Sequence, residues 1–211
     1  MTRRRPSNRR LPWLTIIVHI GGLVPLASLL WAYWRGGLGP DPVGQMTWRT
    51  GRPALLFVLL SLMPTVIAAV TGYTQILRVR RTLGLYGFLY AALHFLVFVG
   101  VDYAFDFGLI VIGVREGPFV LVGLGAGIIL ALLAATSTGG WRRRLGGNWR
   151  RLHRLVYLAG GLAVLHYAWR FKELRVLPLL AGAALLLLLA ARIPPIARRF
   201  RRSHSTGSAA I

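Results

Sequence analysis

Long apolar stretches alternate with short polar segments rich in arginine along most of the 211-residue chain. Each stretch is apolar on all sides rather than along one helical stripe, which is the pattern of a helix surrounded by lipid. A hydrocarbon core about 30 Å thick takes roughly 20 helical residues to cross. The pattern therefore predicts six transmembrane helices, over residues 11–34, 53–77, 83–101, 118–136, 149–169 and 176–191.

The composition indicates the same class of protein. Hydrophobic residues make up 55% of the chain and only five residues are acidic, which is too few polar groups for an ordinary soluble surface. We therefore expect an all-α, polytopic membrane bundle. Cysteine is absent, which excludes disulfides, thiolate catalysis, cysteine-bound clusters and covalent haem attachment.

The distribution of charge predicts how the helices are oriented. In a six-span arrangement, 19 of the 26 basic residues fall on one side, and all five acids fall on the other. Cytoplasmic loops collect Lys and Arg, so both termini are expected in the cytoplasm of a bacterial inner-membrane protein. The expected organisation is a basic N-terminus (1–10), a transmembrane domain (11–193) and a basic, disordered tail (194–211). Nucleic-acid binding is disfavoured, because the arginines lie at helix ends rather than on a separate soluble domain.

Two histidines lie deep inside apolar stretches, where ionisable side chains cost about 2.5 kcal/mol or more and are usually functional. His94 follows Arg81 by 13 residues, and His166 follows Arg154 by 12. At 1.5 Å per residue, both lie roughly 18–20 Å from the inner arginines. Matching depth on parallel helices predicts that His94 and His166 hold the iron of one non-covalent haem b between them.

The other three histidines are open to more than one interpretation. His153 lies about 20 Å before His166 along a helix, near the inner surface, and is either a cofactor contact or an interfacial residue. His19, in the first stretch, is either functional or bonded to a carbonyl or hydroxyl of a neighbouring helix. His204, in a polar tail, is expected to be solvated.

A pair of glycines, Gly123 and Gly127, lies in the fourth stretch. Small residues four apart often let two membrane helices approach closely. The pair therefore predicts a close helix–helix contact rather than a chemical role.

Several motifs together identify a family. They are HIGGLVPL, GGLGPDPV, WRTGRPAL, RRTLGLYGFLYAALHF, LAATST and RRLGGNWRRLHRLVYLAGGLAVLHYAWRFK. Over roughly residues 11–200, their order resembles the MsrQ (YedZ) family of haem-binding membrane subunits in the periplasmic protein-methionine-sulfoxide reductase system. The wider ferric-reductase-like superfamily carries two histidines on each of the third and fifth spans, which hold two stacked haems.

The sequence departs from that superfamily at one position. The residue 14 places before His94 is Arg80, where the resemblance implies an inner histidine. The resemblance therefore implies one complete haem site at His94 and His166, with His153 lacking its usual partner. It also implies FMN, although the chain shows no flavin fingerprint.

The expected function is electron transfer. The chain has no G-x-G-x-x-G loop, no soluble flavin or NADPH domain and no carboxylate within the apolar stretches. The resemblance implies that electrons come from the quinone pool or a cytoplasmic flavin reductase. They would pass to MsrP, the periplasmic molybdopterin subunit that reduces methionine sulfoxide, so this chain needs no catalytic site for that substrate.

Two alternative classes remain. One is another membrane cytochrome b, either a ferric reductase or a quinol-oxidising subunit, although Arg80 and the absence of a fused flavin domain count against the former. The other is a non-redox transporter or assembly factor that uses its histidines to bind a metal or substrate. Such a protein would lack a haem spectrum.

Overall fold

The computed structural model describes residues 12–170 and 176–191. The expected N-terminal segment 1–10, the tail 194–211 and His204 lie outside the described residues. Within those ranges, all regular structure is helical. The longer helices are α1 (Pro12–Trp34), α2 (Pro42–Thr71), α3 (Val79–Leu96), α4 (Phe107–Glu116), α5 (Phe119–Ala135), α8 (Leu155–Trp169) and α9 (Val176–Ala190). The shorter ones are η1 (Thr74–Arg78), η2 (Val97–Asp102), α6 (Gly139–Leu145) and α7 (Gly147–Leu152).

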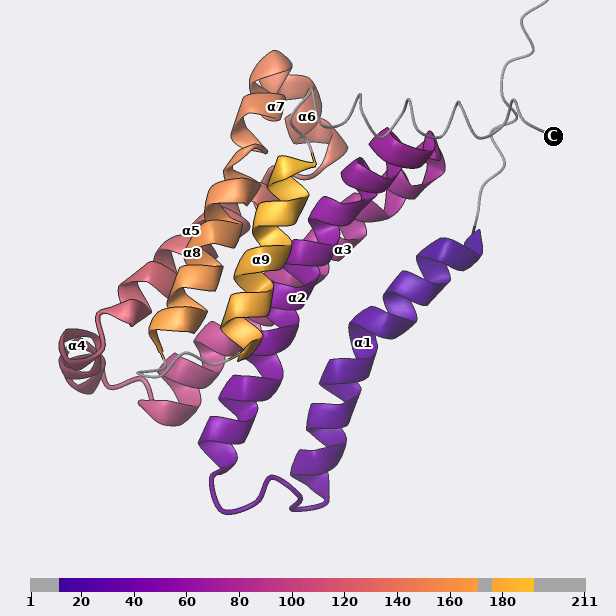
Figure 1. Cartoon of the computed structure of the whole chain (residues 1–211). Coiled ribbons are helices and arrows are strands. Elements are labelled where there is room, and N and C mark those ends of the chain that lie inside the picture. Colours follow the sequence, from indigo (N-terminus) through magenta and orange to yellow (C-terminus); the bar gives the residue numbers. More distant parts are fainter. Residues whose placement is uncertain (1–11, 171–175, 192–211) are drawn as a thin grey trace, which may run out of the picture.

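Two helix pairs form the centre of the bundle. Helix α2 packs along α3, and α5 packs along α8. The pairs are joined because α3 also contacts α5 and α2 also contacts α8, while α9 lies against α8 and α2. Figure 1 shows α1 at one edge of the bundle and α4 lying across the opposite edge. The arrangement confirms the expected all-helical membrane bundle.

A glycine lets α2 and α3 approach closely. A Cβ atom at Gly87 would lie 2.9 Å from Cγ2 of Val58 and 3.2 Å from its backbone nitrogen. Val58 is almost completely buried, and it packs with Leu130 of α5 and Ala159 of α8. One part of the core therefore lies where the two helix pairs meet, and a second part, which includes Phe57 and Tyr90, lies between α2 and α3.

Helix α1 is joined to α3 through the hydroxyl of Tyr90, which is fully buried. This hydroxyl donates to the carbonyl of Gly22 at 2.7 Å and accepts the N–H of Leu26 at 2.9 Å. The two α1 groups flank Pro25, and proline disturbs the helical ladder by removing one donor and crowding the preceding turn. Insertion of a side chain into the ladder is a recognised cause of helix bending, and α1 is bent in Figure 1.

Helix length and composition in the structure support fewer membrane spans than the six predicted from the sequence. Among the described residues, three helical segments are long and apolar enough: Trp13–Trp34, Pro42–Thr71 and Thr74–Asp102. Helices α4 and α5 add a fourth only if they count as one span bent by 112°. Helices α8 and α9 have 15 residues each, about 22 Å, less than a hydrocarbon core of about 30 Å. The expected total of six stays a prediction.

Several predicted helix boundaries are wrong. The second helix ends at Thr71 rather than at residue 77, because Gly72 caps it in the left-handed conformation, and the third begins at Val79 rather than at residue 83. The second helix begins at Pro42 rather than at residue 53, because the Asp41 side chain accepts the N–H of Gly44 and caps the helix there. Pro53 lies inside this helix. The stretch predicted to begin at residue 149 is interrupted after Leu152 by a turn at His153 and continues as α8 from Leu155.

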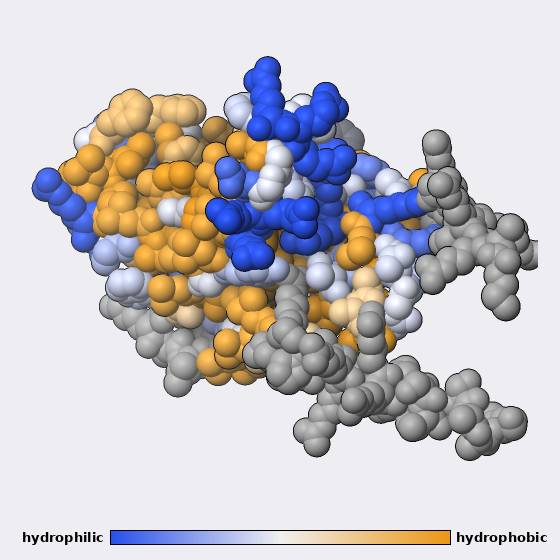
Figure 2. Space-filling view, turned by 90° about the horizontal axis from the view of Figure 1, so that it is seen from above, coloured by the Kyte–Doolittle hydropathy of each residue, from blue (hydrophilic) through white to orange (hydrophobic). Residues whose placement is uncertain are grey.

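The surface of the bundle separates apolar and basic regions. Large apolar side chains of α1, α5 and α9 are exposed, as is usual for surfaces that face lipid. Figure 2, seen from above, shows hydrophilic side chains gathered over part of the end of the bundle that carries α6 and α7. The exposed arginines of this region are Arg142, Arg143, Arg144, Arg150, Arg151 and Arg154.

Candidate functional site

The structure brings His94 of α3 and His166 of α8 together. Their ring centroids lie 6.1 Å apart, and the rings meet edge to face at an interplanar angle of 79°. Both side chains are partly buried between the two central helix pairs. The juxtaposition agrees with the matching depth of the two residues in the sequence.

Hydrogen bonds determine which ring nitrogen of each histidine carries a proton. His94 Nδ1 lies 3.2 Å from the carbonyl oxygen of Thr47, and His166 Nδ1 lies 2.8 Å from that of Phe119. A carbonyl oxygen only accepts, so each Nδ1 must carry the hydrogen and donate it. In both neutral rings, Nε2 is then left with its lone pair available to a metal ion.

The same arrangement surrounds histidine ligands in metalloproteins, where the second ring N–H donates to a carboxylate, carbonyl or water. Metal–imidazole bonds of about 2 Å on opposite sides of one ion would place the ring centroids roughly 6 Å apart. The described residues contain no cluster of three or more His, Cys, Asp or Glu side chains able to hold a metal. Two imidazoles with available Nε2 atoms fit a haem, which His94 and His166 would hold.

Aromatic and cationic side chains lie beside the histidine pair. The ring of Phe119 lies 5.6 Å from that of His166 and 5.7 Å from the guanidinium carbon of Arg170. The buried hydroxyl of Thr50 lies 3.3 Å from His94 Nδ1. Directly after α3, the backbone widens into the π-helical segment η2, a feature often found near functional sites.

His153 lies apart from this pair in the turn between α7 and α8. Its Nε2 is 3.2 Å from Oγ1 of Thr136, and that hydroxyl already donates to the carbonyl of Leu132 at 2.7 Å. His153 must therefore donate from Nε2, the nitrogen that stays free in His94 and His166. The ring also stacks on Trp149, with centroids 4.0 Å apart.

The structure also places Arg80 near His153. The positive charge of Arg80 acts on the His153 imidazole. In this chain, an arginine rather than a histidine thus acts on His153, the residue that the superfamily resemblance pairs with an inner histidine. The surroundings of His153 differ from those of His94 and His166.

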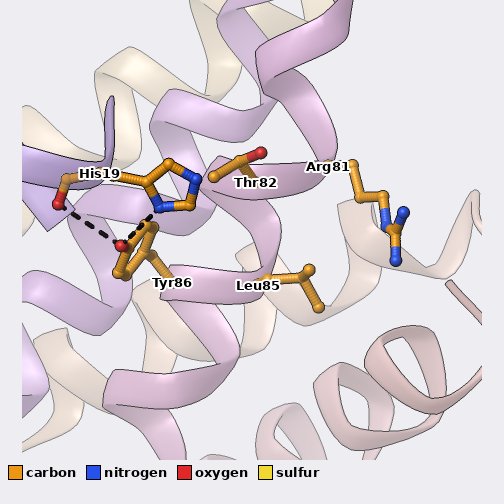
Figure 3. A pocket seen from close by; sticks show the side chains of 5 residues that line it. All are labelled: His19, Arg81, Thr82, Leu85 and Tyr86. Carbon is orange, nitrogen blue, oxygen red and sulfur yellow. Dashed lines mark hydrogen bonds between the residues drawn. The ribbon is translucent and has the colours of Figure 1, made fainter. Parts of the chain in front are cut away.

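His19 lies in a separate hollow of about 290 Å³ that is lined by His19, Arg81, Thr82, Leu85 and Tyr86. Figure 3 shows the imidazole beside Tyr86, with Arg81 pointing away from it. His19 Nδ1 lies 2.9 Å from the Tyr86 hydroxyl. The structure thus favours the interpretation that His19 bonds a hydroxyl of a neighbouring helix.

Sequence reasoning missed the groups that orient the two central histidines. The carbonyls of Thr47 and Phe119 carry no residue-type signal, because every residue has a backbone carbonyl. The predicted close packing at Gly123 and Gly127 is wrong for Gly127, where an added Cβ would meet nothing within 4 Å. At Gly123 the close contact between helices is present, because this glycine of α5 lies against the ring of His166 on α8.

Comparisons with known proteins agree on one family. Residues 48–164 match the family described as the ferric reductase like transmembrane component. The chain is 42% identical over 179 residues to a protein of Xanthomonas euvesicatoria pv. vesicatoria (strain 85-10) named protein-methionine-sulfoxide reductase heme-binding subunit MsrQ. Proteins with the same name from Xanthomonas oryzae pv. oryzae (strain MAFF 311018) and Xanthomonas axonopodis pv. citri (strain 306) are 40% identical. Each alignment covers 82% of both chains.

Proposed function

Because the chain belongs to the MsrQ family of ferric-reductase-like membrane proteins, we propose that it is a haem b subunit that carries electrons across the bacterial inner membrane. The acceptor would be the periplasmic molybdopterin subunit MsrP, which repairs oxidised methionines in periplasmic proteins. The donor would be the quinone pool or a cytoplasmic flavin reductase. This chain would supply electrons and leave the reduction of methionine sulfoxide to its partner.

One observation carries the proposal. His94 and His166 face each other, and each donates from Nδ1 to a backbone carbonyl of a different helix. These bonds fix the tautomer and orientation of both rings and leave both Nε2 atoms for one iron. Because the sequence contains no cysteine, the haem would be held without covalent attachment.

The chemistry of such a site suits electron transfer. A bound haem would supply a one-electron carrier whose iron has two imidazole ligands and no open position for oxygen. The protein contributes the orientation of both ligands and partial burial of both rings. Both properties support a conduit rather than an oxygen-activating enzyme.

The region around His153, at the cytoplasmic end of the proposed electron path, differs from the two-histidine haem site of the superfamily. Arg80 lies near His153, whose Nε2 is engaged by Thr136. We propose that this region contacts a second cofactor, for which the basic side chains Arg80, Arg151 and Arg154 suit an anion such as FMN. The six-span topology with cytoplasmic termini belongs to the same proposal and is supported by the charge distribution.

A different membrane cytochrome b is the main alternative, since ferric-reductase-like domains share the histidine pair. The identity of 40–42% to MsrQ subunits favours the proposed partner over that alternative. A non-redox transporter would not need two facing imidazoles with matched tautomers.

The deciding experiment is a reduced-minus-oxidised absorption spectrum of the purified protein, with extraction and quantification of haem and flavin. The proposal expects a low-spin b-type spectrum and non-covalent haem. A protein purified intact without haem would contradict the proposal and favour the non-redox alternative.

A further inference from the structure

The two facing histidines contact their neighbouring helices in the same way. His94 donates to the carbonyl of Thr47 on α2, and the residue four positions after Thr47 is Gly51. His166 donates to the carbonyl of Phe119 on α5, and the residue four positions after Phe119 is Gly123. Each imidazole thus lies over a turn formed by a carbonyl at position i and a glycine at position i+4.

Helix geometry explains why the second residue is a glycine. In an α-helix, the carbonyl at position i already accepts the N–H of residue i+4, so an outside donor must reach the remaining lone pair. The Cβ of residue i+4 tilts towards the N-terminus and leans over that same turn. Without a Cβ at position i+4, an imidazole from another helix gains access to the carbonyl.

The distances show how little space there is. A Cβ at Gly123 would lie 2.7 Å from His166 Nδ1 and 2.8 Å from Cε1. A Cβ at Gly51 would lie 3.0 Å from His94 Cε1 and 3.1 Å from Nδ1. At both positions the added carbon meets the nitrogen that makes the hydrogen bond. The obstruction is tighter at Gly123 than at Gly51.

We infer that Gly51 and Gly123 are positioning residues that let His94 and His166 donate to backbone carbonyls and so hold both rings in ligating orientation. The inference rests on the proposed haem function and assigns to these glycines a role in cofactor binding and tuning. Donation from Nδ1 raises the basicity of an imidazole ligand. A more basic ligand stabilises the oxidised iron. The two hydrogen bonds therefore also keep the midpoint potential of the haem low.

The chain offers a matched control on the same helix. Gly127 lies one turn after Gly123 in α5, but a Cβ there would meet nothing within 4 Å. Gly123→Ala, Gly51→Ala and Gly127→Ala are each made in the full chain and purified in detergent. Haem content, the low-spin absorption spectrum, the haem midpoint potential and helical content are measured for each.

Gly123→Ala is expected to lower haem affinity by roughly 10- to 100-fold, the usual effect of losing an outer-shell partner of a ligand. Gly51→Ala should have a smaller effect, because the gap there is wider. The haem that remains should show a raised midpoint potential, which a purely structural defect would not produce. Gly127→Ala should match the wild type in all four measurements.

Two results would overturn the inference. One is a Gly123→Ala protein with the haem content, spectrum and potential of Gly127→Ala. The other is loss of haem only in proportion to loss of folded protein, with an unchanged potential in the remainder. A wild-type protein without low-spin haem would instead overturn the proposed function and this inference with it, whereas haem-loaded wild type with insensitive glycines overturns the inference alone.

Discussion

His94 on α3 and His166 on α8 meet edge to face with ring centroids 6.1 Å apart, although they lie in different helix pairs of the bundle. Each ring is oriented by a hydrogen bond from Nδ1 to a backbone carbonyl within its own helix pair. The acceptor is Thr47 on α2 for His94 and Phe119 on α5 for His166. The site therefore exists only where the two pairs join. A change in either histidine removes half of it.

Replacement of His94 or His166 with alanine should abolish low-spin haem binding in both variants. Each change removes one of two axial imidazoles, and the described residues offer no neighbouring cluster of metal-binding side chains as a substitute. Haem content per purified protein and the reduced-minus-oxidised spectrum measure the effect. His19→Ala is the control, because His19 bonds Tyr86 in a separate hollow and should leave the spectrum unchanged.

His153→Ala should have a smaller or qualitatively different effect. Its Nε2 is hydrogen-bonded to Thr136 and its ring stacks on Trp149. Removal of His153 should therefore leave the low-spin signal of the haem held by His94 and His166 in place. Loss of extracted flavin, of a second haem or of reduction by the physiological donor is the expected result. If His153→Ala lost the low-spin haem while His94→Ala retained it, the pairing proposed here would be the wrong one.

The charge distribution predicts the topology. Reporter fusions that end near Asp106 should be active on the periplasmic side, and fusions that end near Arg144 should be active in the cytoplasm. A paired alkaline phosphatase and fluorescent-protein scan measures both sides. The opposite pattern would contradict the orientation and the direction of electron flow.

Reduction of methionine sulfoxide should require a separate periplasmic subunit. We expect turnover when this protein and MsrP are reconstituted together in vesicles with a donor that cannot reach MsrP directly. Omission of the membrane protein, or use of His166→Ala in its place, should stop turnover. Equal rates with and without this protein would rule out the conduit role.

Tyr90→Phe should destabilise the docking of α1. The substitution removes the hydroxyl that bonds both Gly22 and Leu26 across the interruption at Pro25, at an expected cost of about 1–2 kcal/mol in unfolding free energy. Unfolding in mixed detergent micelles measures it. Tyr73→Phe, at an exposed position between α2 and α3, should change stability little, and equal effects of the two would argue against the role given to Tyr90.

Much of the architecture could be predicted from the sequence. Hydropathy and composition identified an all-helical membrane protein, and the fourth apolar stretch, predicted at 118–136, is close to α5 (Phe119–Ala135). The start of α2 differs from the predicted residue 53, because the helix is capped by the Asp41 side chain and Pro53 lies inside it. The break at His153 has no signal in the sequence. The arginines around His153 and the apolar residues after it have the pattern of one continuous helix that starts at the membrane surface.

The sequence by itself determined which segments are apolar enough for lipid, and it predicted which side collects arginine and which histidines lie at equal depth. These properties depend on single residues and their spacing along one helix, so they are readable from the chain. Only the tertiary structure decided which nitrogen of each histidine is free, that Gly123 faces His166 and that Tyr90 joins α1 to α3. Each of these depends on a backbone group of another helix, and the position of that group is fixed by packing between elements rather than by the local pattern of residues.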